Sequence, residues 1–315
     1  MTEKNKPLIT ITGVLGKQGY SAARTLLQSG RYRIRGITRR IDSPEARNLM
    51  ELGAELINIP LSLGHQEDFV KAFHGAYGAF IMTPGIAPTQ THETQLGNQL
   101  ADAAVEAGVQ HLIFSSLENV DQLTRGEKFA PHFTDKARTE AYIRKLPITS
   151  SFIYMAFFYT NLLEFYTPYL DGDTLVFPIY LPKNFKAPFV DPLTATGPAV
   201  LEIFDHPGRY AGESLPIIGD IISPQEMVDS FVEVTGKKAV YSAAYTKENF
   251  LKHFPDFKNN DPLVREILGM AEYAIEYGYF QKHRDWHWSR NVNPKALTWK
   301  QFLQTTGWQG QKMSY

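Results

Sequence analysis

The feature that most constrains the fold is a glycine-rich turn directly behind a short apolar run. Residues 8–12 (LITIT) predict a buried strand, and residues 21–28 predict a helix that ends at Gly30. Between them lies a G-x-x-G-x-x-G pattern. In such a strand–turn–helix unit the glycines allow a tight turn, a close approach of a pyrophosphate and close helix packing. We therefore expect a dinucleotide site at the helix N-terminus, and its residues are Gly13, Val14, Leu15, Gly16, Lys17, Gln18 and Gly19.

The end of the next strand distinguishes between two cofactors. Residues 32–38 alternate like a strand and end in Thr38-Arg39-Arg40. An NAD-binding protein usually carries an acidic residue there for the ribose 2′-hydroxyl. A guanidinium suits a 2′-phosphate instead, by charge and by bidentate hydrogen bonding, and Lys17 adds a second positive charge. The pattern predicts NADP(H). The alternative is that Arg39 and Arg40 are solvated side chains at a strand end.

Composition excludes several classes of function. The chain has 315 residues, with 32 lysines and arginines against 33 acidic residues, so it has no electrostatic footprint for nucleic acid or anionic membrane. It has no cysteine, which excludes disulfides, thiolate metal sites and a cysteine nucleophile. No apolar run approaches the roughly 20 residues that span a bilayer, and the polar start does not suggest a signal peptide. We expect a cytoplasmic protein that contacts neither membrane nor nucleic acid directly.

The first half alternates strand and helix. After the first two strands, apolar patterns predict strands at residues 54–59, 77–83, 111–115 and 148–155, and helices at 43–52, 67–74, 93–107 and 133–145. This order is typical of the α/β class, here a Rossmann fold with a doubly wound parallel sheet and helices on both faces. Ligands of such sheets bind at the carboxyl ends of the strands.

The second half is richer in proline and aromatic residues and loses this alternation. It contains predicted strands at residues 175–179 and 187–190 and a predicted helix at 192–204, and Ser223 and Thr298 each begin a capping-box pattern. We assign residues 1–155 to an NADP-binding Rossmann domain. Residues 156–315 are assigned to a smaller α/β substrate-binding lobe, with room for the chain to cross back to the sheet.

Several motifs occur together between residue 8 and about residue 305. They are the glycine turn, Thr38-Arg39, residues 103–119 (AAVEAGVQHLIFSSLEN), His132-Phe133-x-x-Lys136, Asn161-Leu162-Leu163 and residues 293–298 (NPKALT). By these motifs the chain resembles the NmrA-like family of atypical short-chain dehydrogenases, and in particular its redox sensors and their fungal relatives.

This resemblance implies NADP(H) bound in an extended form. It places Thr38 and Arg39 at the 2′-phosphate, Thr83 at the middle of the cofactor, Lys136 at the nicotinamide ribose, and Phe158 and Asn161 beside the nicotinamide. Two departures concern the cofactor pocket. Ile59-Pro60 stands where the family often has Gly-Asp, and residues 154–156 (YMA) stand where Arg-x-Pro is common.

The chemistry depends on His132 and Lys136. Short-chain dehydrogenases usually carry Tyr-x-x-x-Lys on one helix face, and here His132 occupies the tyrosine position. Three hypotheses remain open. The chain is an enzyme in which His132 or Lys136 moves the proton, a non-catalytic NADP(H) sensor that regulates a protein partner, or a redox-neutral isomerase or cyclase.

Aromatic residues favour a bulky aromatic substrate, such as a secondary metabolite. Phe157 and Tyr159 follow a strand end and are expected to line its pocket, although most aromatic residues of this half are expected to form its core. Ser115 and Ser116 either act on the substrate or cofactor, Ser115 as a catalytic group and Ser116 as a substrate contact, or only end a strand. No metal is expected, because His283 and His287, four apart on one helical face, lack a third ligand.

Overall fold

The computed structural model describes residues 6–84 and 92–313. They form two compact units, each built from separate stretches of chain. Unit 1 comprises Met1–Asn119, His132–Tyr154 and Pro192–Leu215, and unit 2 comprises Val120–Pro131, Met155–Asp191 and Pro216–Tyr315. A single cut after residue 155 does not describe these units, because residues 192–215 return to unit 1.

The centre of unit 1 is a seven-stranded sheet with the order β11-β6-β5-β4-β1-β2-β3. The pairs from β3 through β6 are parallel. The Rossmann prediction is therefore confirmed. The strands are β1 (Leu8–Ile11), β2 (Arg33–Thr38), β3 (Glu55–Asn58), β4 (Gly78–Ile81), β5 (His111–Ser116), β6 (Thr149–Met155) and β11 (Ser214–Ile217), the last two of which end in unit 2.

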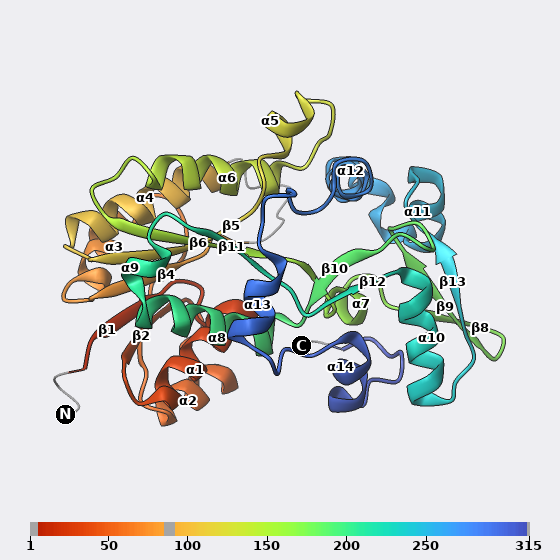
Figure 1. The fold of residues 1–315 in the computed structure, drawn as a ribbon, viewed down its shortest axis with the longest axis horizontal. Helices are drawn as coiled ribbons and strands as arrows, with labels where there is room; N and C mark the ends of the chain where they lie inside the picture. Colours follow the sequence, from red (N-terminus) through yellow and green to blue (C-terminus); the bar gives the residue numbers. More distant parts are fainter. Residues whose placement is uncertain (1–5, 85–91, 314–315) are drawn as a thin grey trace. The chain divides into compact units, whose positions relative to one another are not determined.

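Helices cover both faces of this sheet. Helices α1, α2 and α8 lie on one face, and α3, α4 and α6 lie on the other (Figure 1). Every residue of β1, β4 and β5 is buried, as expected for strands covered on both sides. The helices of unit 1 are α1 (Lys17–Ser29), α2 (Pro44–Glu51), α3 (Gln66–Phe73), α4 (Glu93–Glu106), α6 (Pro131–Ile143), α8 (Pro192–Asp205) and α9 (Pro207–Tyr210).

Helix α8 packs tightly on α1 although the two are far apart in sequence. The Gly197 N–H donates to Ser21 Oγ at 2.9 Å. A Cβ on Gly197 would lie 2.5 Å from the Ser21 carbonyl oxygen, so only glycine permits this approach. This contact holds residues 192–215 on the helix that follows the glycine turn.

Unit 2 contains two three-stranded sheets, ordered β12-β10-β7 and β13-β9-β8. Its strands are β7 (Phe157–Phe158), β8 (Tyr169–Asp171), β9 (Thr174–Ile179), β10 (Ala187–Val190), β12 (Asp220–Ile222) and β13 (Ala239–Ala243). Its helices are α5 (Val120–Thr124), α7 (Asn161–Glu164), α10 (Pro224–Thr235), α11 (Lys247–His253), the 3-10 helix η2 (Pro255–Asn259), α12 (Asp261–Tyr277), α13 (Trp286–Val292) and α14 (Trp299–Thr306).

Aromatic rings fill the core of unit 2. Trp308 and Trp299 are fully buried, with ring centroids 6.1 Å apart, and Phe177 and Phe231 pack on Trp308. Both predicted capping boxes are present. Ser223 caps α10 and Thr298 caps α14.

Several predicted boundaries were wrong. Helix α1 begins at Lys17 rather than residue 21, so Gly19 lies inside the helix. The predicted strands at residues 175–179 and 187–190 are present as β9 and β10, whereas β11, which extends the central sheet, and β7, β8, β12 and β13 of unit 2 were not predicted.

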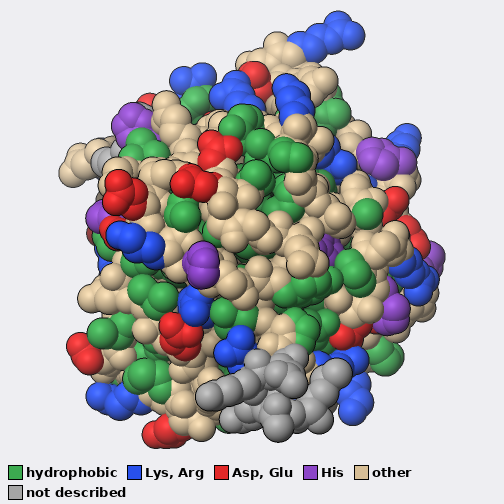
Figure 2. All heavy atoms as spheres, turned by 90° about the vertical axis from the view of Figure 1, so that its left-hand side faces the viewer, with side chains coloured by type: hydrophobic (Ala, Val, Ile, Leu, Met, Phe, Trp, Pro, Cys, Tyr) green, Lys and Arg blue, Asp and Glu red, His purple; other side chains and the backbone are tan. Residues whose placement is uncertain are grey.

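Acidic, basic and hydrophobic side chains are interspersed over the face drawn in Figure 2. Within residues 6–84 and 92–313, no helix has the length and apolar character needed to cross a membrane.

Candidate functional site

The glycine turn has the geometry that a phosphate cradle requires. Gly13 has a φ of +55°, in the left-handed region that favours glycine. A Cβ on Gly19 would lie 2.5 Å from the Gly13 carbonyl oxygen and 2.8 Å from Val14 Cα, so the helix meets the turn without space for a side chain. Gly16 is the N-cap of α1 and has no side chain to accept from the first N–H groups of the helix. These residues fit a bound pyrophosphate.

Hydrogen bonds fix the turn beside the end of β4. Thr12 Oγ1 donates to the Met82 carbonyl oxygen at 2.9 Å, and the Met82 N–H donates to Thr12 Oγ1 at 2.8 Å. The Val14 N–H donates to the Ile37 carbonyl oxygen at 3.3 Å. The turn is thereby tied to the carboxyl ends of both neighbouring strands, where sequence analysis placed Thr83 and Thr38.

The two arginines after β2 are exposed, whereas Thr38 is buried. Thr38 Oγ1 accepts from the Arg40 N–H at 3.1 Å, which fixes the backbone beyond the strand. Asp42 is exposed and immediately precedes Ser43, which caps α2. The arrangement leaves the Arg39 guanidinium accessible to a phosphate.

A buried ion pair lies at the carboxyl end of β4. Lys136, on α6, pairs with Glu93, the first residue of α4. Thr83 Oγ1 donates to Glu93 Oε1 at 2.5 Å and accepts from Lys136 Nζ at 3.2 Å. The exposed fractions of Thr83, Glu93 and Lys136 are 7%, 5% and 9%. We call these three residues the lysine cluster.

The remaining predicted residues of unit 1 lie on β5 and α6. Ser115 Oγ donates to Gln18 Oε1 at 2.8 Å, which connects β5 to the first turn of α1. Ser116 Oγ donates to the Lys136 carbonyl oxygen at 3.5 Å. His132 is buried one helical turn before Lys136, with its ring edge-on to Phe133. Unit 1 therefore brings the glycine turn, both serines and the lysine cluster to one edge of the sheet.

The other predicted contacts belong to unit 2. Phe157 is buried and packs on Tyr180, Phe189 and Tyr279. Tyr159 is fully buried between Phe189 and the aromatic residues of α14, and burial raises the pKa of its hydroxyl well above the usual value. Both rings thus contribute to the core, and their role toward a substrate stays a prediction.

Phe158 and Asn161 are more accessible than these two rings. Phe158 is partly exposed at the end of β7, and Asn161 is the partly exposed first residue of α7. The Asn161 side chain forms a hydrogen bond with the Tyr180 hydroxyl. Their contact with a nicotinamide also stays a prediction.

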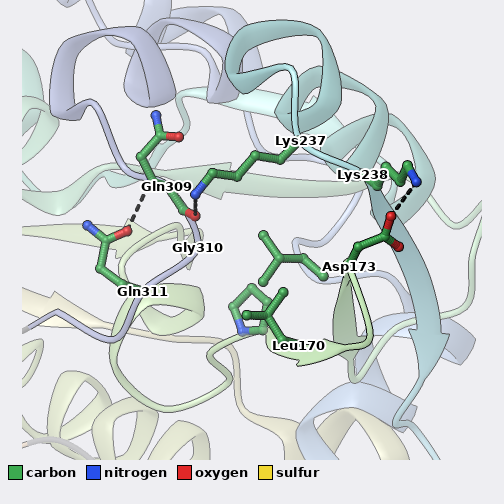
Figure 3. A pocket seen from close by; sticks show the side chains of 9 residues that line it. Leu170, Asp173, Lys237, Lys238, Gln309, Gly310 and Gln311 are labelled. Atoms are coloured by element: carbon green, nitrogen blue, oxygen red, sulfur yellow. Dashed lines mark hydrogen bonds and ion pairs between the residues drawn. The ribbon is translucent and has the colours of Figure 1, made fainter.

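A separate depression of about 520 Å³ lies in unit 2 (Figure 3). Leu170 and Leu175 give it an apolar wall, while Lys237 Nζ donates to the Gln309 carbonyl oxygen at 3.0 Å and Lys238 pairs with Asp173. It contains none of the predicted site residues.

The described residues contain no cluster of three or more metal-ligating side chains. The prediction that His283 and His287 share one helical face was wrong, because α13 begins at Trp286 and His283 lies in the preceding turn.

Sequence reasoning missed Glu93 as a site residue and gave it only the start of a helix. An acidic residue in the first turn of a helix is common, so the sequence carried no signal that separates this carboxylate from an ordinary one. Only the fold brings it to Lys136. Glu93 follows the Pro84–Thr91 loop, of which only Pro84 is among the described residues.

Comparisons with known proteins agree on one family. Residues 5–304 match the sequence model of the NmrA-like family. The NmrA-like family domain-containing oxidoreductase lnaB of Aspergillus flavus is 34% identical over 255 residues, which cover 75% of each chain. An NmrA-like family domain-containing protein of Dictyostelium discoideum is 28% identical and covers 86% of this chain and 88% of its own.

Solved structures share the fold at lower identity. NmrA, described as a negative transcriptional regulator in complex with NADP, superposes with a TM-score of 0.76 at 21% identity and covers 94% of each chain. The triphenylmethane reductase of Citrobacter sp., complexed with NADP(H), gives a TM-score of 0.72 at 18% identity and covers 94% of this chain and 99% of its own.

Proposed function

This chain belongs to the NmrA-like family, and from this premise we propose that it is an NADP(H)-dependent oxidoreductase of a small aromatic molecule. Lys136 is the group that carries the proton. The proposal rests chiefly on one observation. The lysine cluster and the glycine turn lie at the same edge of the sheet, tied together through Thr12 and the end of β4.

We propose the following residues as those that hold the dinucleotide. The Gly13–Gly19 turn would hold the pyrophosphate at the N-terminus of α1. The exposed Arg39 would pair with the 2′-phosphate, with Lys17 and Arg40 adding positive charge. Thr83 would lie near the middle of the cofactor, and Phe158 and Asn161 beside the nicotinamide. When bound, NADPH supplies a hydride and is oxidised to NADP+.

Lys136 completes this reduction with a proton. Its ammonium donates one proton to the substrate atom that becomes electron-rich, and the neutral amine then regains a proton from solvent. Ser115 and Ser116 stand at the same strand end as hydrogen-bond donors. His132, buried one turn earlier, replaces the tyrosine of the usual pair.

Two further observations support the substrate class and the reaction type. Phe157 and Tyr159 belong to an aromatic-rich unit, which suits a flat apolar substrate. The Aspergillus flavus relative lnaB is named an oxidoreductase, and this favours hydride transfer over a redox-neutral isomerisation or cyclisation.

A binding titration followed by an assay tests this function. Wild type should bind NADPH more tightly than NADH, and a panel of aromatic ketones, quinones and imines should include a compound that oxidises NADPH in its presence. The Lys136→Met variant should bind NADPH but lose this turnover by about two to four orders of magnitude, the usual contribution of a general acid. Full turnover by that variant would remove Lys136 from the mechanism.

The placement of His132 favours a second function, a non-catalytic NADP(H) sensor, because the usual proton donor is missing one turn before Lys136. This function requires a protein partner whose affinity differs between the NADPH and NADP+ forms. Turnover at ordinary enzymatic rates would exclude it as the sole function.

A further inference from the structure

The carboxylate of Glu93 is one of the most enclosed charges in unit 1. Its side chain is 6% exposed and that of Lys136 is 11% exposed. Removing an ion from water costs several kcal/mol, and this cost is offset only where a partner and further hydrogen bonds surround it. Glu93 has both, because Lys136 pairs with it and Thr83 donates to it. The two charges therefore depend on each other.

The ammonium of Lys136 uses its three N–H groups unequally. They point to Glu93 Oε1, to Thr83 Oγ1 at 3.2 Å and to the Pro84 carbonyl oxygen at 3.5 Å. The contact to Pro84 is at the limit of a hydrogen bond. A reacting molecule can replace it while the other two contacts keep the ammonium in place.

The other titratable side chains of α6 and of the segment after β5 have partners of their own. On α6, Asp135 accepts from Thr94 Oγ1 at 3.0 Å and from Arg138, and Glu140 pairs with Arg144 at 2.7 Å. His132 lies one turn before Lys136, and Glu118 is buried just beyond β5. Within the described ranges, Glu93 is the acidic residue that forms an ion pair with Lys136.

We propose that Glu93 is a positioning residue that holds the Lys136 ammonium at the end of β4 and supplies its counter-charge. The chain then works with a lysine–glutamate pair where short-chain dehydrogenases use a tyrosine–lysine pair. This role rests on the proposed function only in taking Lys136 as the proton carrier. The electrostatic coupling of the two side chains stands independently of any substrate.

NMR of the free protein tests this coupling directly. In protein labelled with ¹³C at lysine Cε, the Lys136 signal is the one that is absent from Lys136→Arg. Glu93→Gln keeps the size and an acceptor oxygen but removes the charge. In this variant we expect the Lys136 Cε signal at pH 7 to shift and its two Hε signals, which a fixed ammonium keeps apart, to merge. Glu93→Asp, which keeps a carboxylate, should restore most of the difference.

Two further measurements make the test independent of one variant. Glu140→Gln removes another buried carboxylate of α6 and should leave the Lys136 signals unchanged. In protein labelled at the glutamate carboxyl carbons, Lys136→Met should shift the Glu93 carboxyl signal at pH 7, because the pairing is reciprocal.

Unchanged signals of Lys136 in Glu93→Gln and of Glu93 in Lys136→Met would overturn the inference. This outcome differs from a failure of the proposed function. If Lys136→Met keeps full NADPH-dependent turnover while Glu93→Gln still changes the Lys136 signals, the proposed function fails and the pairing stands.

Discussion

Two lysine–carboxylate pairs, one in each unit, show how much burial changes the same interaction. Lys136 and Glu93 in unit 1 have side chains 11% and 6% exposed, whereas Lys238 and Asp173 in unit 2 have side chains 70% and 71% exposed. The exposed pair can exchange either partner for water, and such pairs contribute little to stability. The buried pair cannot, so the loss of one partner leaves an uncompensated charge.

This contrast distinguishes the lysine cluster of the candidate site from an ordinary ion pair at the protein surface. In unit 2 the lysines around the depression are held by the Gln309 carbonyl and by Asp173, at the protein surface (Figure 3). In unit 1 the lysine lies among strand ends that the fold brings together. Three matched pairs of variants test whether enclosure, rather than residue type, decides the effect of a substitution, and a fourth pair tests the assignment of Arg39.

The largest effect is expected for the two lysines. Lys136→Met leaves the Glu93 carboxylate buried without its counter-charge and should lower the free energy of unfolding by about 3 to 5 kcal/mol. Lys238→Met should leave it unchanged within error. Urea unfolding of both variants measures the difference, and equal effects would break the comparison.

A buried histidine should dominate the stability of unit 1 at acid pH. Burial lowers the pKa of His111 from 6.5 to about 4. Between these values the unfolded chain binds a proton that the folded chain does not, so stability falls as pH falls from about 6.5 to about 4, by about 3 kcal/mol in total.

The matched variants for this prediction are His111→Gln and His253→Gln. His111→Gln should remove most of this fall in the free energy of unfolding, measured by urea unfolding at a series of pH values. His253→Gln should remove less of it, since His253 in unit 2 is only half-buried. A slope that persists in His111→Gln would assign the acid sensitivity to other groups.

Alanine substitutions at two glycines of unit 1, one enclosed and one open to solvent, should also differ in how much stability they remove. The Cβ of Gly19→Ala meets backbone atoms at 2.5 and 2.8 Å, which cannot rotate away. We expect a loss of about 1 to 3 kcal/mol in stability, together with weaker NADPH binding. Gly208→Ala, with nothing within 4 Å of the added atom, is the control. Thermal unfolding and calorimetric titration compare the two, and equal NADPH affinity in both variants would argue against the turn as the phosphate cradle.

The smallest effect on the free energy of unfolding is expected for Arg39→Ala, which should change cofactor preference instead. Hydrogen bonds to a charged group contribute about 1.5 to 3 kcal/mol, so Arg39→Ala should weaken NADPH binding roughly 10- to 100-fold and leave NADH binding nearly unchanged. Arg33→Ala, at the other end of β2, should alter neither affinity. Equal affinity of wild type for the two cofactors would contradict the assignment of Arg39.

Local patterns in the sequence predicted local structure well. The glycine turn, the capping boxes at Ser223 and Thr298 and the parallel sheet all follow from short segments or from a regular repeat of them. Each is fixed by neighbouring residues in the chain.

Contacts between segments that are far apart in the chain could not be predicted from the sequence. Glu93 and Lys136 are 43 residues apart, and nothing in either segment indicates that α4 begins where α6 turns its lysine inward. Strand β11 joins the sheet only after the chain has passed through unit 2. Periodicity also could not tell that Tyr159 lies among the aromatic residues of α14 and not at the surface.

The most direct test of the central claim is isotope transfer. Purified protein is incubated with a small-molecule extract of its source organism and NADPH deuterated at either transferable position, and the products are examined by mass spectrometry. We predict that one deuterium, from one of the two positions, appears in an aromatic product in wild type but not in Lys136→Met. A protein that binds NADPH yet transfers deuterium to no molecule in the extract would contradict the claim that this chain is an oxidoreductase.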